Sequence, residues 1–332
     1  MTKLPADKIN KIKNYLLSLA KSDGSFNASL KKDYKGIADS VVSDLAATVY
    51  IAEIALTMGF ELPYPEKTVE YIQARQRPEG NFHPIEDYGL DEAAQKGHSF
   101  YNTCMGLRGL RVFNKYPQYD PRPFLEKIIR NEFKSGVFAP PYAPCMTANC
   151  YASINETMPE DCNDKLADFL LEKQDRKTGW FFQPGLNEKG FPFERNNPFT
   201  FHASRFFHLA GREVPIADKI VDTFLREQEA DGSWKLGYVH GTFDAIVALR
   251  ILSGDPDKYQ NAVTRGAEWA LTCQQDDGGF NHFGDERPSE VDACYFHIAT
   301  LVMAGMIPTK LTTENRWIGW GHTLLNAGVK EQ

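Results

Sequence analysis

The chain has 332 residues, of which 42% are hydrophobic and 24% are charged, and its formal net charge is −7 at pH 7. This composition is typical of a globular protein, and one repeat domain over residues 1–332 is acceptable because repeats share one continuous core. The negative charge and the lack of a Lys/Arg cluster argue against nucleic acid as a partner.

Cysteine spacing and the N-terminal residues indicate the compartment. The six cysteines show no CxxC spacing, and the first twenty residues are Lys-rich and amphipathic, unlike a secretory signal. No apolar run reaches the roughly 18 to 20 residues that a membrane-spanning helix needs. We therefore expect a cytoplasmic protein with reduced thiols, and we leave open a peripheral contact with a membrane surface.

A short motif recurs six times along the chain, in which an amphipathic helix runs into a glycine turn and then an aromatic residue. The copies are Gly24-Ser25-Phe26, Gly80-Asn81-Phe82, Gly136-Val137-Phe138, Gly179-Trp180-Phe181, Gly232-Ser233-Trp234 and Gly278-Gly279-Phe280. Four copies are preceded by a glutamine, namely Gln76, Gln174, Gln228 and Gln274. Glycine suits the left-handed conformation just after a helix, and the aromatic side chain can fold back over a neighbouring helix.

Two kinds of helix alternate with these turns. Helices with one polar face are predicted over residues 8–20, 66–76, 122–133, 163–174, 216–228 and 262–274. Helices that are apolar all round are predicted to begin near Ser43, Ser99, Met146, Phe199, Gly241 and Val291. One-sided helices belong outside and uniformly apolar helices inside, so the chain is predicted to be all-α, with six inner and six outer helices.

The alternative arrangement is an open solenoid of helix pairs, which has the same pairing logic. Open arrays usually keep a fixed period, whereas the turn glycines here recur at irregular intervals of 43 to 56 residues. We therefore favour a closed (α/α)6 toroid. The stretch Arg316-Trp317-Ile318-Gly319-Trp320 could plug one mouth of this ring or complete it.

The fifth copy of the motif carries a family resemblance. Phe224, Gln228 and Asp231-Gly232-Ser233-Trp234 resemble the Gln-Trp repeat of squalene–hopene-type terpene cyclases, whose superfamily includes the protein prenyltransferase β subunits. Similar turns recur to about Gly305. The resemblance implies a terpenoid cyclase/prenyltransferase-like toroid and a small-molecule isoprenoid substrate.

Prenyltransferases of this superfamily hold zinc through an Asp-x-Cys element on one inner helix and a His on the next. Aligning Asp292-Ala293-Cys294 with that element leaves no later repeat to supply the His. In the other register, Tyr295 replaces the His, while Val239 and Gly241 replace Asp and Cys. The chain also lacks an Asp-Asp-x-x-Asp element for magnesium, so we expect neither a metal site nor a cofactor.

Class II terpene cyclases instead begin with a proton from an Asp-x-Asp-Asp motif that opens an inner helix after a Gly-Gly-Phe turn. Here Gly278-Gly279-Phe280 leads to Glu290-Val291-Asp292-Ala293. The resemblance therefore implies that Asp292 is the general acid and that Glu290 is the first acid of the motif. Ala293 departs from the pattern at the position where a third acid normally orders the proton donor.

A proton donor of this kind needs partners. The helix dipole alone stabilises the carboxylate left after proton transfer by ~0.3 to 1 kcal/mol. Glu290 could share a proton with Asp292, and His240 at the start of the adjacent inner helix is a second candidate partner. Ring closure would also bring Asp44 towards Asp292. Helix capping is the alternative role for Asp292 and for Asp44.

A carbocation requires a dry cavity with aromatic faces, each well-placed ring contributing ~0.5 to 2 kcal/mol. The side chains expected to bind substrate lie on the inner helices: Asp44, Tyr50, Phe100, Tyr101, Tyr151, Phe199, Phe201, Phe243, Asp244, Tyr295 and Phe296. For each ring, ordinary core packing is the alternative.

These observations favour a class II terpene cyclase that acts on a linear isoprenoid or a prenylated aromatic compound and requires no protein partner. One alternative is a prenyltransferase-like enzyme or subunit without the usual zinc site. Another is a non-catalytic isoprenoid-binding barrel.

Overall fold

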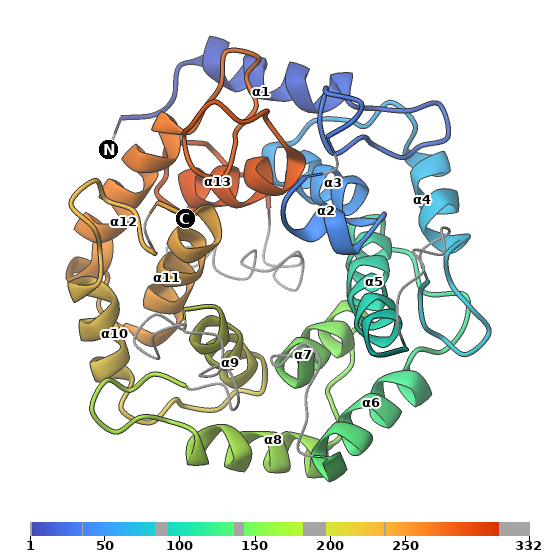
Figure 1. The fold of residues 1–332 in the computed structure, drawn as a ribbon, viewed down its shortest axis with the longest axis vertical. Coiled ribbons are helices and arrows are strands. Elements are labelled where there is room, and N and C mark those ends of the chain that lie inside the picture. Colours follow the sequence, from blue (N-terminus) through green and yellow to red (C-terminus); the bar gives the residue numbers. More distant parts are fainter. Residues whose placement is uncertain are drawn as a thin grey trace.

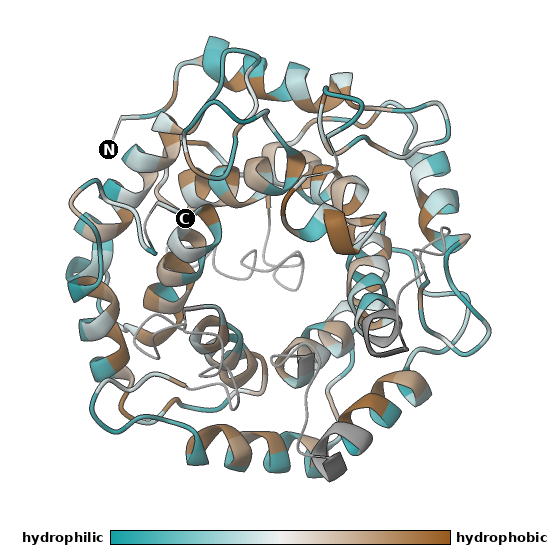
Figure 2. Ribbon diagram, viewed as in Figure 1, coloured by the Kyte–Doolittle hydropathy of each residue, from teal (hydrophilic) through white to brown (hydrophobic). Residues whose placement is uncertain are grey.

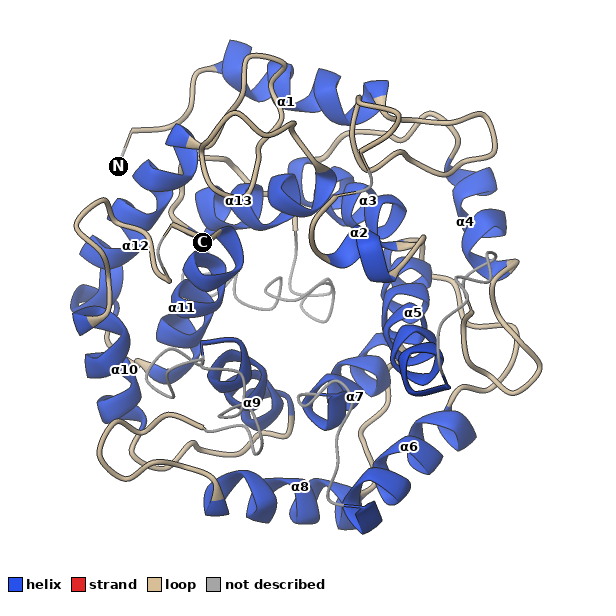
Figure 3. Cartoon of the chain, viewed as in Figure 1, coloured by secondary structure: helices blue, strands red, loops and turns tan. Residues whose placement is uncertain are grey.

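The computed structural model describes residues 2–34, 36–83, 92–135, 143–181, 197–235 and 237–311. In this part of the chain, helices and connecting loops form two concentric rings (Figures 1 and 3). The outer ring consists of α1 (Ala6–Ser18), α4 (Pro65–Gln73), α6 (Arg122–Ser135), α8 (Glu160–Glu172), α10 (Ala217–Arg226) and α12 (Pro256–Thr272). The inner ring consists of α3 (Ala46–Met58), α5 (Glu92–Val112), α7 (Ala143–Ser153), α9 (Asn197–Leu209), α11 (Val239–Leu252) and α13 (Val291–Met303). A short extra helix, α2 (Asp39–Val42), precedes α3.

The inner helices are buried over more of their residues than the outer helices, as the hydrophobic patterns predicted. Every residue of α13 is buried, whereas only Ile12, Tyr15 and Leu16 are buried in α1. The outer helices turn hydrophobic residues towards the inner ring and hydrophilic residues outward (Figure 2). The predicted alternation of one-sided outer helices and uniformly apolar inner helices is therefore confirmed.

The glycine turns adopt the predicted left-handed conformation. The φ angles of Gly24, Gly80, Gly179, Gly232 and Gly278 lie between 81° and 95°. The glutamines hold these turns through their side chains. Gln174 Nε2, for example, donates to the carbonyl oxygen of Gly179 at 2.9 Å and to that of Pro215 at 2.8 Å. The copy at Gly136-Val137-Phe138 and the stretch 316–320 lie outside the described residues.

The aromatic residue of each described turn is also tied to the inner helix that follows it. The backbone amides of Phe26, Phe82, Phe181 and Trp234 donate to the hydroxyl oxygens of Thr48, Thr103, Thr200 and Thr242 at 2.9 to 3.2 Å. In the last copy, the Phe280 amide donates to Cys294 Sγ at 3.3 Å. This bond satisfies a buried amide and fixes each turn against its inner helix.

The ring closes between its last and first repeats. Gly278 packs so tightly on α1 that a Cβ added there would lie 2.6 Å from the Lys11 carbonyl oxygen. The amide of Val291, at the start of α13, donates to the Ala28 carbonyl oxygen at 2.9 Å. In the inner ring, α13 packs directly on α3. These contacts confirm the toroid and exclude the open solenoid.

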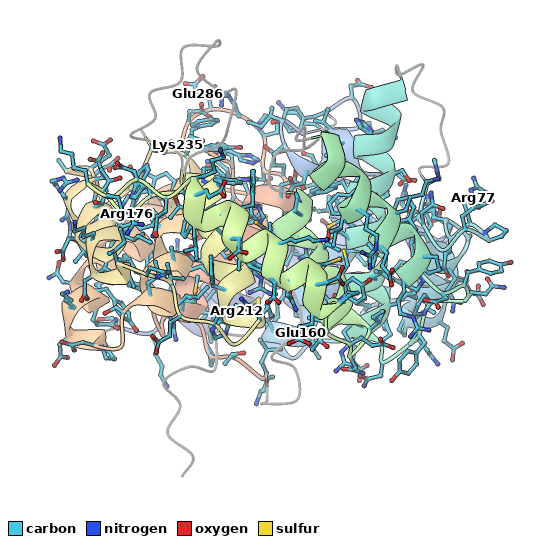
Figure 4. All side chains as sticks on the ribbon, turned by 90° about the horizontal axis from the view of Figure 1, so that it is seen from below. Arg77, Glu160, Arg176, Arg212, Lys235 and Glu286 are labelled. Atoms are coloured by element: carbon cyan, nitrogen blue, oxygen red, sulfur yellow. The ribbon has the colours of Figure 1, made fainter. Side chains whose placement is uncertain are left out.

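The two ends of the ring carry different loops. Figure 4 shows Lys235 and Glu286, which precede inner helices, towards one end, and Arg212 and Glu160, which follow inner helices, towards the other. We call the first end the upper rim, because the outer-to-inner loops and the starts of the inner helices meet there. None of the described helices combines the length and apolar character needed to cross a bilayer.

Candidate active site

Asp292 lies in the first turn of α13, at the upper rim, and has no exposed surface. Its two carboxylate oxygens accept hydrogen bonds from one residue of α2: the Ser40 amide donates to Oδ2 at 2.9 Å and the Ser40 hydroxyl to Oδ1 at 2.6 Å. The N-cap of α13 is Glu290. Asp292 is therefore not a helix cap, and its carboxyl is directed towards α2.

Glu290 is also buried and is surrounded by hydrogen-bond donors. His282 Nδ1 lies 2.5 Å from its Oε1, and the Tyr34 hydroxyl donates to the same oxygen at 3.1 Å. The Ile37 amide donates to Oε2 at 3.2 Å. The residues before and within α2 therefore bind both acids of the motif, Glu290 through Tyr34 and Ile37, and Asp292 through Ser40.

Asp39, the first residue of α2, adds a third carboxyl. The Tyr50 hydroxyl donates to Asp39 Oδ2, and Tyr101 forms a further hydrogen bond with the carboxyl. These tyrosines belong to α3 and α5, and their hydroxyl oxygens lie 3.4 Å apart. Asp39 is only half-buried, so part of its surface remains accessible.

Burial shifts the pKa of both aspartates upward. Desolvation and the charges of Asp39 and Glu290 raise the pKa of Asp292 to about 7, although the two hydrogen bonds from Ser40 oppose this shift. Desolvation also raises the pKa of Asp39, against the hydrogen bonds from Tyr50 and Tyr101. A substantial fraction of Asp292 is thus protonated near neutral pH.

The aromatic side chains of α3, α9, α11 and α13 form a connected cluster next to these carboxyls. Tyr50 stacks on Tyr295 with ring centroids 4.2 Å apart, and Phe296 lies 5.7 Å from Tyr50. Phe243 joins Phe296 at 4.9 Å and Phe201 at 5.8 Å. Five of the rings predicted to bind substrate therefore lie together. The first of them, Tyr50, is the hydrogen-bond partner of Asp39.

His240 lies at the start of α11, as expected, but its ring packs on other aromatic and histidine rings. His240 stacks on Tyr238 at 4.9 Å, on His282 at 5.4 Å and on Phe296 at 4.2 Å. Burial and the neighbouring His282 lower the pKa of His240 well below its usual range. His282, which sequence reasoning missed, occupies the place beside the carboxyls, so the expectation that His240 partners Asp292 is corrected.

Asp44 is a second correction. It precedes α3 and faces the outer ring, where Arg75 Nε donates to its Oδ2 at 2.8 Å and the Tyr71 hydroxyl donates to its backbone oxygen at 3.3 Å. Because α3 begins at Ala46, Asp44 lies before the helix and its side chain turns outward. Asp39 occupies the position near Asp292 that was expected for Asp44.

The remaining predicted residues are buried in different surroundings. Tyr151 is buried near Glu126 of α6 and Cys162 of α8, and its contact with substrate stays a prediction. Asp244 lies one turn inside α11 near Lys235, and burial raises its pKa well above the usual range while Lys235 opposes the shift. Phe100 and Phe199 are buried, and their contact with substrate stays a prediction.

A separate ion pair lies farther along the inner helices. Arg108 Nε donates to Glu53 Oε1 at 3.0 Å and Nη2 donates to Oε2 at 2.6 Å, with both side chains fully buried. Arg108 Nη2 also donates to the Tyr295 hydroxyl at 3.4 Å. Arg205 Nε donates to Asn149 Oδ1 at 2.9 Å. Sequence reasoning missed this layer, whose clearest signal was an acid within the apolar run of α3.

The residues of this chain do not fit the zinc site of protein prenyltransferases. Cys294 Sγ accepts the Phe280 amide, and desolvation raises the pKa of the Cys294 thiol, which opposes the thiolate that zinc requires. Across the described ranges, no three His, Cys, Asp or Glu side chains lie close enough together to hold a metal ion.

Two family models and one known cyclase match parts of this chain. Residues 206–296 match the squalene-hopene cyclase C-terminal domain, and residues 2–87 match the prenyltransferase alpha-alpha toroid domain. The squalene–hopene cyclase of Zymomonas mobilis subsp. mobilis is 38% identical over 64 residues, which span 18% of this chain and 9% of that relative.

Solved structures show the same fold. A variant of type II terpene cyclase MstE from Scytonema in complex with geranylgeranyl dihydroxybenzoate (substrate) aligns with TM-score 0.50 and 14% identity, covering 89% of this chain and 95% of the other. A second variant, in complex with merosterolic acid A (product), aligns with TM-score 0.51 and 15% identity, covering 91% and 97%.

Proposed function

We propose that this chain, a member of the squalene–hopene cyclase and prenyltransferase toroid superfamily, is a class II terpene cyclase in which Asp292 is the general acid. Its substrate would be a linear isoprenoid or a prenylated aromatic compound. The observation that carries the proposal is the buried carboxyl of Asp292, held at the upper rim beside a connected aromatic cluster.

The protonation step requires an acid that is still protonated near neutral pH and lies away from bulk water. Asp292 meets both conditions, because desolvation raises its pKa to about 7. In this step the O–H bond of the acid breaks and its proton forms a C–H bond with one alkene carbon, using the π electron pair. The O–H electron pair remains on the carboxylate, and the other alkene carbon becomes a tertiary cation.

The cation then needs electron-rich faces and no nucleophile. Tyr50, Tyr295, Phe296, Phe243 and Phe201 provide a run of rings that begins at the acid cluster. Each ring that presents its face to the cation stabilises it by ~0.5 to 2 kcal/mol. Such a run suits a charge that moves along the substrate as successive rings close.

The test is to incubate the purified full chain with polyprenyl substrates of several lengths, free and attached to an aromatic acid. The final cation is discharged either by loss of a proton, which gives a product with the mass of the substrate, or by capture of water, which adds one water molecule. Either product has a different retention time and fewer alkene protons by NMR. Asp292→Asn should abolish both products. Asp257→Asn is the matched control, because Asp257 occupies the same position in the first turn of α12 but is exposed.

Other outcomes would support the alternatives. Wild-type cyclisation that persists at full rate in Asp292→Asn contradicts the role of Asp292. Substrate that binds and is recovered unchanged favours a non-catalytic binding barrel. Stoichiometric zinc in the purified protein favours a prenyltransferase-like enzyme and contradicts a pure cyclase.

A further inference from the structure

The short helix α2 brings two adjacent residues into the site. The chain leaves the first glycine turn, crosses to the inner edge of the ring and forms α2 beside α3 (Figure 1). Ser40 uses both its amide and its hydroxyl on Asp292, which keeps no exposed surface. Asp39, the preceding residue, retains accessible surface. Asp39 is therefore the more exposed of these two acidic residues.

The hydrogen bonds of Asp39 point towards the aromatic cluster. Its carboxyl is bound by Tyr50, whose ring stacks on Tyr295, and by Tyr101 of α5. These partners belong to two inner helices, so they fix the carboxyl between α3 and α5. Asp39 thus lies where the acid cluster meets the proposed cation-binding rings.

We propose that Asp39 is a second catalytic carboxyl, which shares the initiating proton with Asp292, so that the substrate alkene receives its proton from this pair of acids. This inference rests on the proposed cyclase function and identifies a further residue of the same site. The Glu290-Val291-Asp292-Ala293 element lacks the third acid of the cyclase motif, because Ala293 stands at that position. Asp39 of α2 supplies an acid from the first repeat instead.

Electrostatics favours one proton on this pair. The charge of Asp39 raises the pKa of Asp292, because one ionised carboxylate makes the protonated form of its neighbour more favourable. Because the two groups interact, the pair titrates as a unit that holds one proton in the resting enzyme. On reaction, the O–H bond of the protonated carboxyl of the pair breaks, the proton forms a C–H bond with one alkene carbon through the π electrons, and the O–H electrons stay on the carboxylate.

The groups around the pair come from several elements. They are Tyr34 from the loop before α2, Tyr50 from α3, Tyr101 and Arg108 from α5, His282 and Glu290 from the segment before α13, and Tyr238 and Asp244 at α11. Among the described residues, no Lys or Arg forms an ion pair with Asp39 or Asp292, although the charge of Arg108, which is paired with Glu53, opposes the rise in the pKa of Asp39. The direct partners of both aspartates are therefore neutral hydrogen-bond donors.

The experiment compares Asp39→Asn, Asp39→Glu and Asp33→Asn in the full chain. Asp33 is an exposed acid of the same segment, so its variant controls for a change of charge near the rim. We expect Asp39→Asn to lower the single-turnover rate at least about 100-fold, as for loss of a general acid, with substrate Kd within threefold. Asp39→Glu should recover part of the rate, and Asp33→Asn should stay within twofold of wild type.

A pH profile separates catalysis from a structural role. Tyr50→Phe removes a hydrogen bond that lowers the pKa of Asp39, so the pair should hold its proton to higher pH and the decline in rate should move upward. A purely structural role for Asp39 would lower the melting temperature or raise Kd and would leave this decline in place.

The possible results distinguish this inference from the function on which it rests. Wild-type turnover with Asp39→Asn within threefold of wild type overturns the role of Asp39 and leaves the cyclase intact. A 100-fold loss that is explained by loss of substrate binding or by unfolding also overturns it. Absence of any cyclised product from the wild-type chain overturns the cyclase function and the role of Asp39 together.

Discussion

The acidic side chains of two buried layers of the inner ring have opposite kinds of hydrogen-bond partner. In the lower layer, the Glu53 carboxylate meets the Arg108 guanidinium through two hydrogen bonds. In the upper layer, Asp292 and Asp39 are bound by the neutral groups of Ser40, Tyr50 and Tyr101. Burial makes a bare carboxylate costly in both layers. Burial raises the pKa of Glu53 as well, but there the charge and the hydrogen bonds of Arg108 oppose the rise, whereas the direct hydrogen-bond donors of the upper acids are neutral.

The contrast explains why only one layer can supply the initiating proton. Although burial opposes its charge, Glu53 holds the pKa of Arg108 well above its usual range. That pair is a fixed structural charge. The pKa of Asp292 lies near 7, where an acid can both hold a proton and release it.

The largest expected effect on stability comes from breaking the lower pair. Glu53→Gln leaves Arg108 as a buried charge without its carboxylate, and we predict a loss of about 3 to 5 kcal/mol in the free energy of unfolding. Urea denaturation measures this change. The double variant Glu53→Gln/Arg108→Met should recover much of the loss. A single variant as stable as wild type would show that the pair does not hold this layer together.

The equivalent substitution in the upper layer, Asp292→Asn, should raise the free energy of unfolding instead of lowering it. The pKa of Asp292 is raised from 3.8 to about 7 on folding, so the native state binds its proton more tightly than the unfolded chain. Stability is therefore lost as the pH rises from about 4 to 7, and the full cost applies above 7. Asp292→Asn removes this ionisation and should stabilise the chain at pH 8 by on the order of 1 to 3 kcal/mol.

Denaturation of wild type and Asp292→Asn at pH 5 and pH 8 checks this sign. The advantage of the variant should be smaller at pH 5, where wild-type Asp292 is mostly protonated. An Asp292→Asn variant that is less stable than wild type at pH 8 would show that its ionised form is stabilised by the fold, as in the lower layer.

The same pKa governs activity. The acid must be protonated, so the rate should be highest below pH 7 and should fall about tenfold per pH unit well above it. Single-turnover rates between pH 5 and pH 9 measure this dependence. A rate that stays constant up to pH 9 would mean that the acid of the upper layer does not titrate in this range.

The smallest effect is expected at the residue that joins the two layers. Tyr295 stacks on Tyr50 and its hydroxyl accepts a hydrogen bond from Arg108. Tyr295→Phe keeps the ring and removes the hydroxyl, so we predict a loss of about 0.5 to 1.5 kcal/mol in stability and a rate within a few-fold of wild type. Thermal unfolding and turnover test it, and Tyr295→Leu, which also removes the ring, should lower the rate further.

Much of the fold could be predicted because each repeat carries its own local signals. The glycine turns and the difference between one-sided and uniformly apolar helices depend on residues close together in sequence. Ring closure, the central prediction, followed from the number and irregular spacing of these repeats. The contacts of Gly278 with α1 and of α13 with α3 confirm it.

The site was only partly predictable, because its hydrogen bonds join residues about 250 positions apart. Asp292 and Glu290 stood in a recognisable motif, but their donors Ser40 and Ile37 come from a segment with no helical period and a helix of four residues. Asp39 therefore gave no signal of its own. The error at Asp44 has the same origin. Helix α3 begins at Ala46, two residues after Asp44, and the position of this start decides which acid faces inward.

The most direct test of the account is to run the reaction in D2O. Carboxyl protons exchange with solvent, so a reaction that begins with protonation must place one non-exchangeable deuterium on the substrate carbon that receives the proton. We predict a cyclised product of the wild-type chain with one such deuterium on the former alkene CH carbon that received the proton, located by NMR, and no such product from Asp292→Asn. A cyclised product without deuterium at that carbon would contradict initiation by a protein acid.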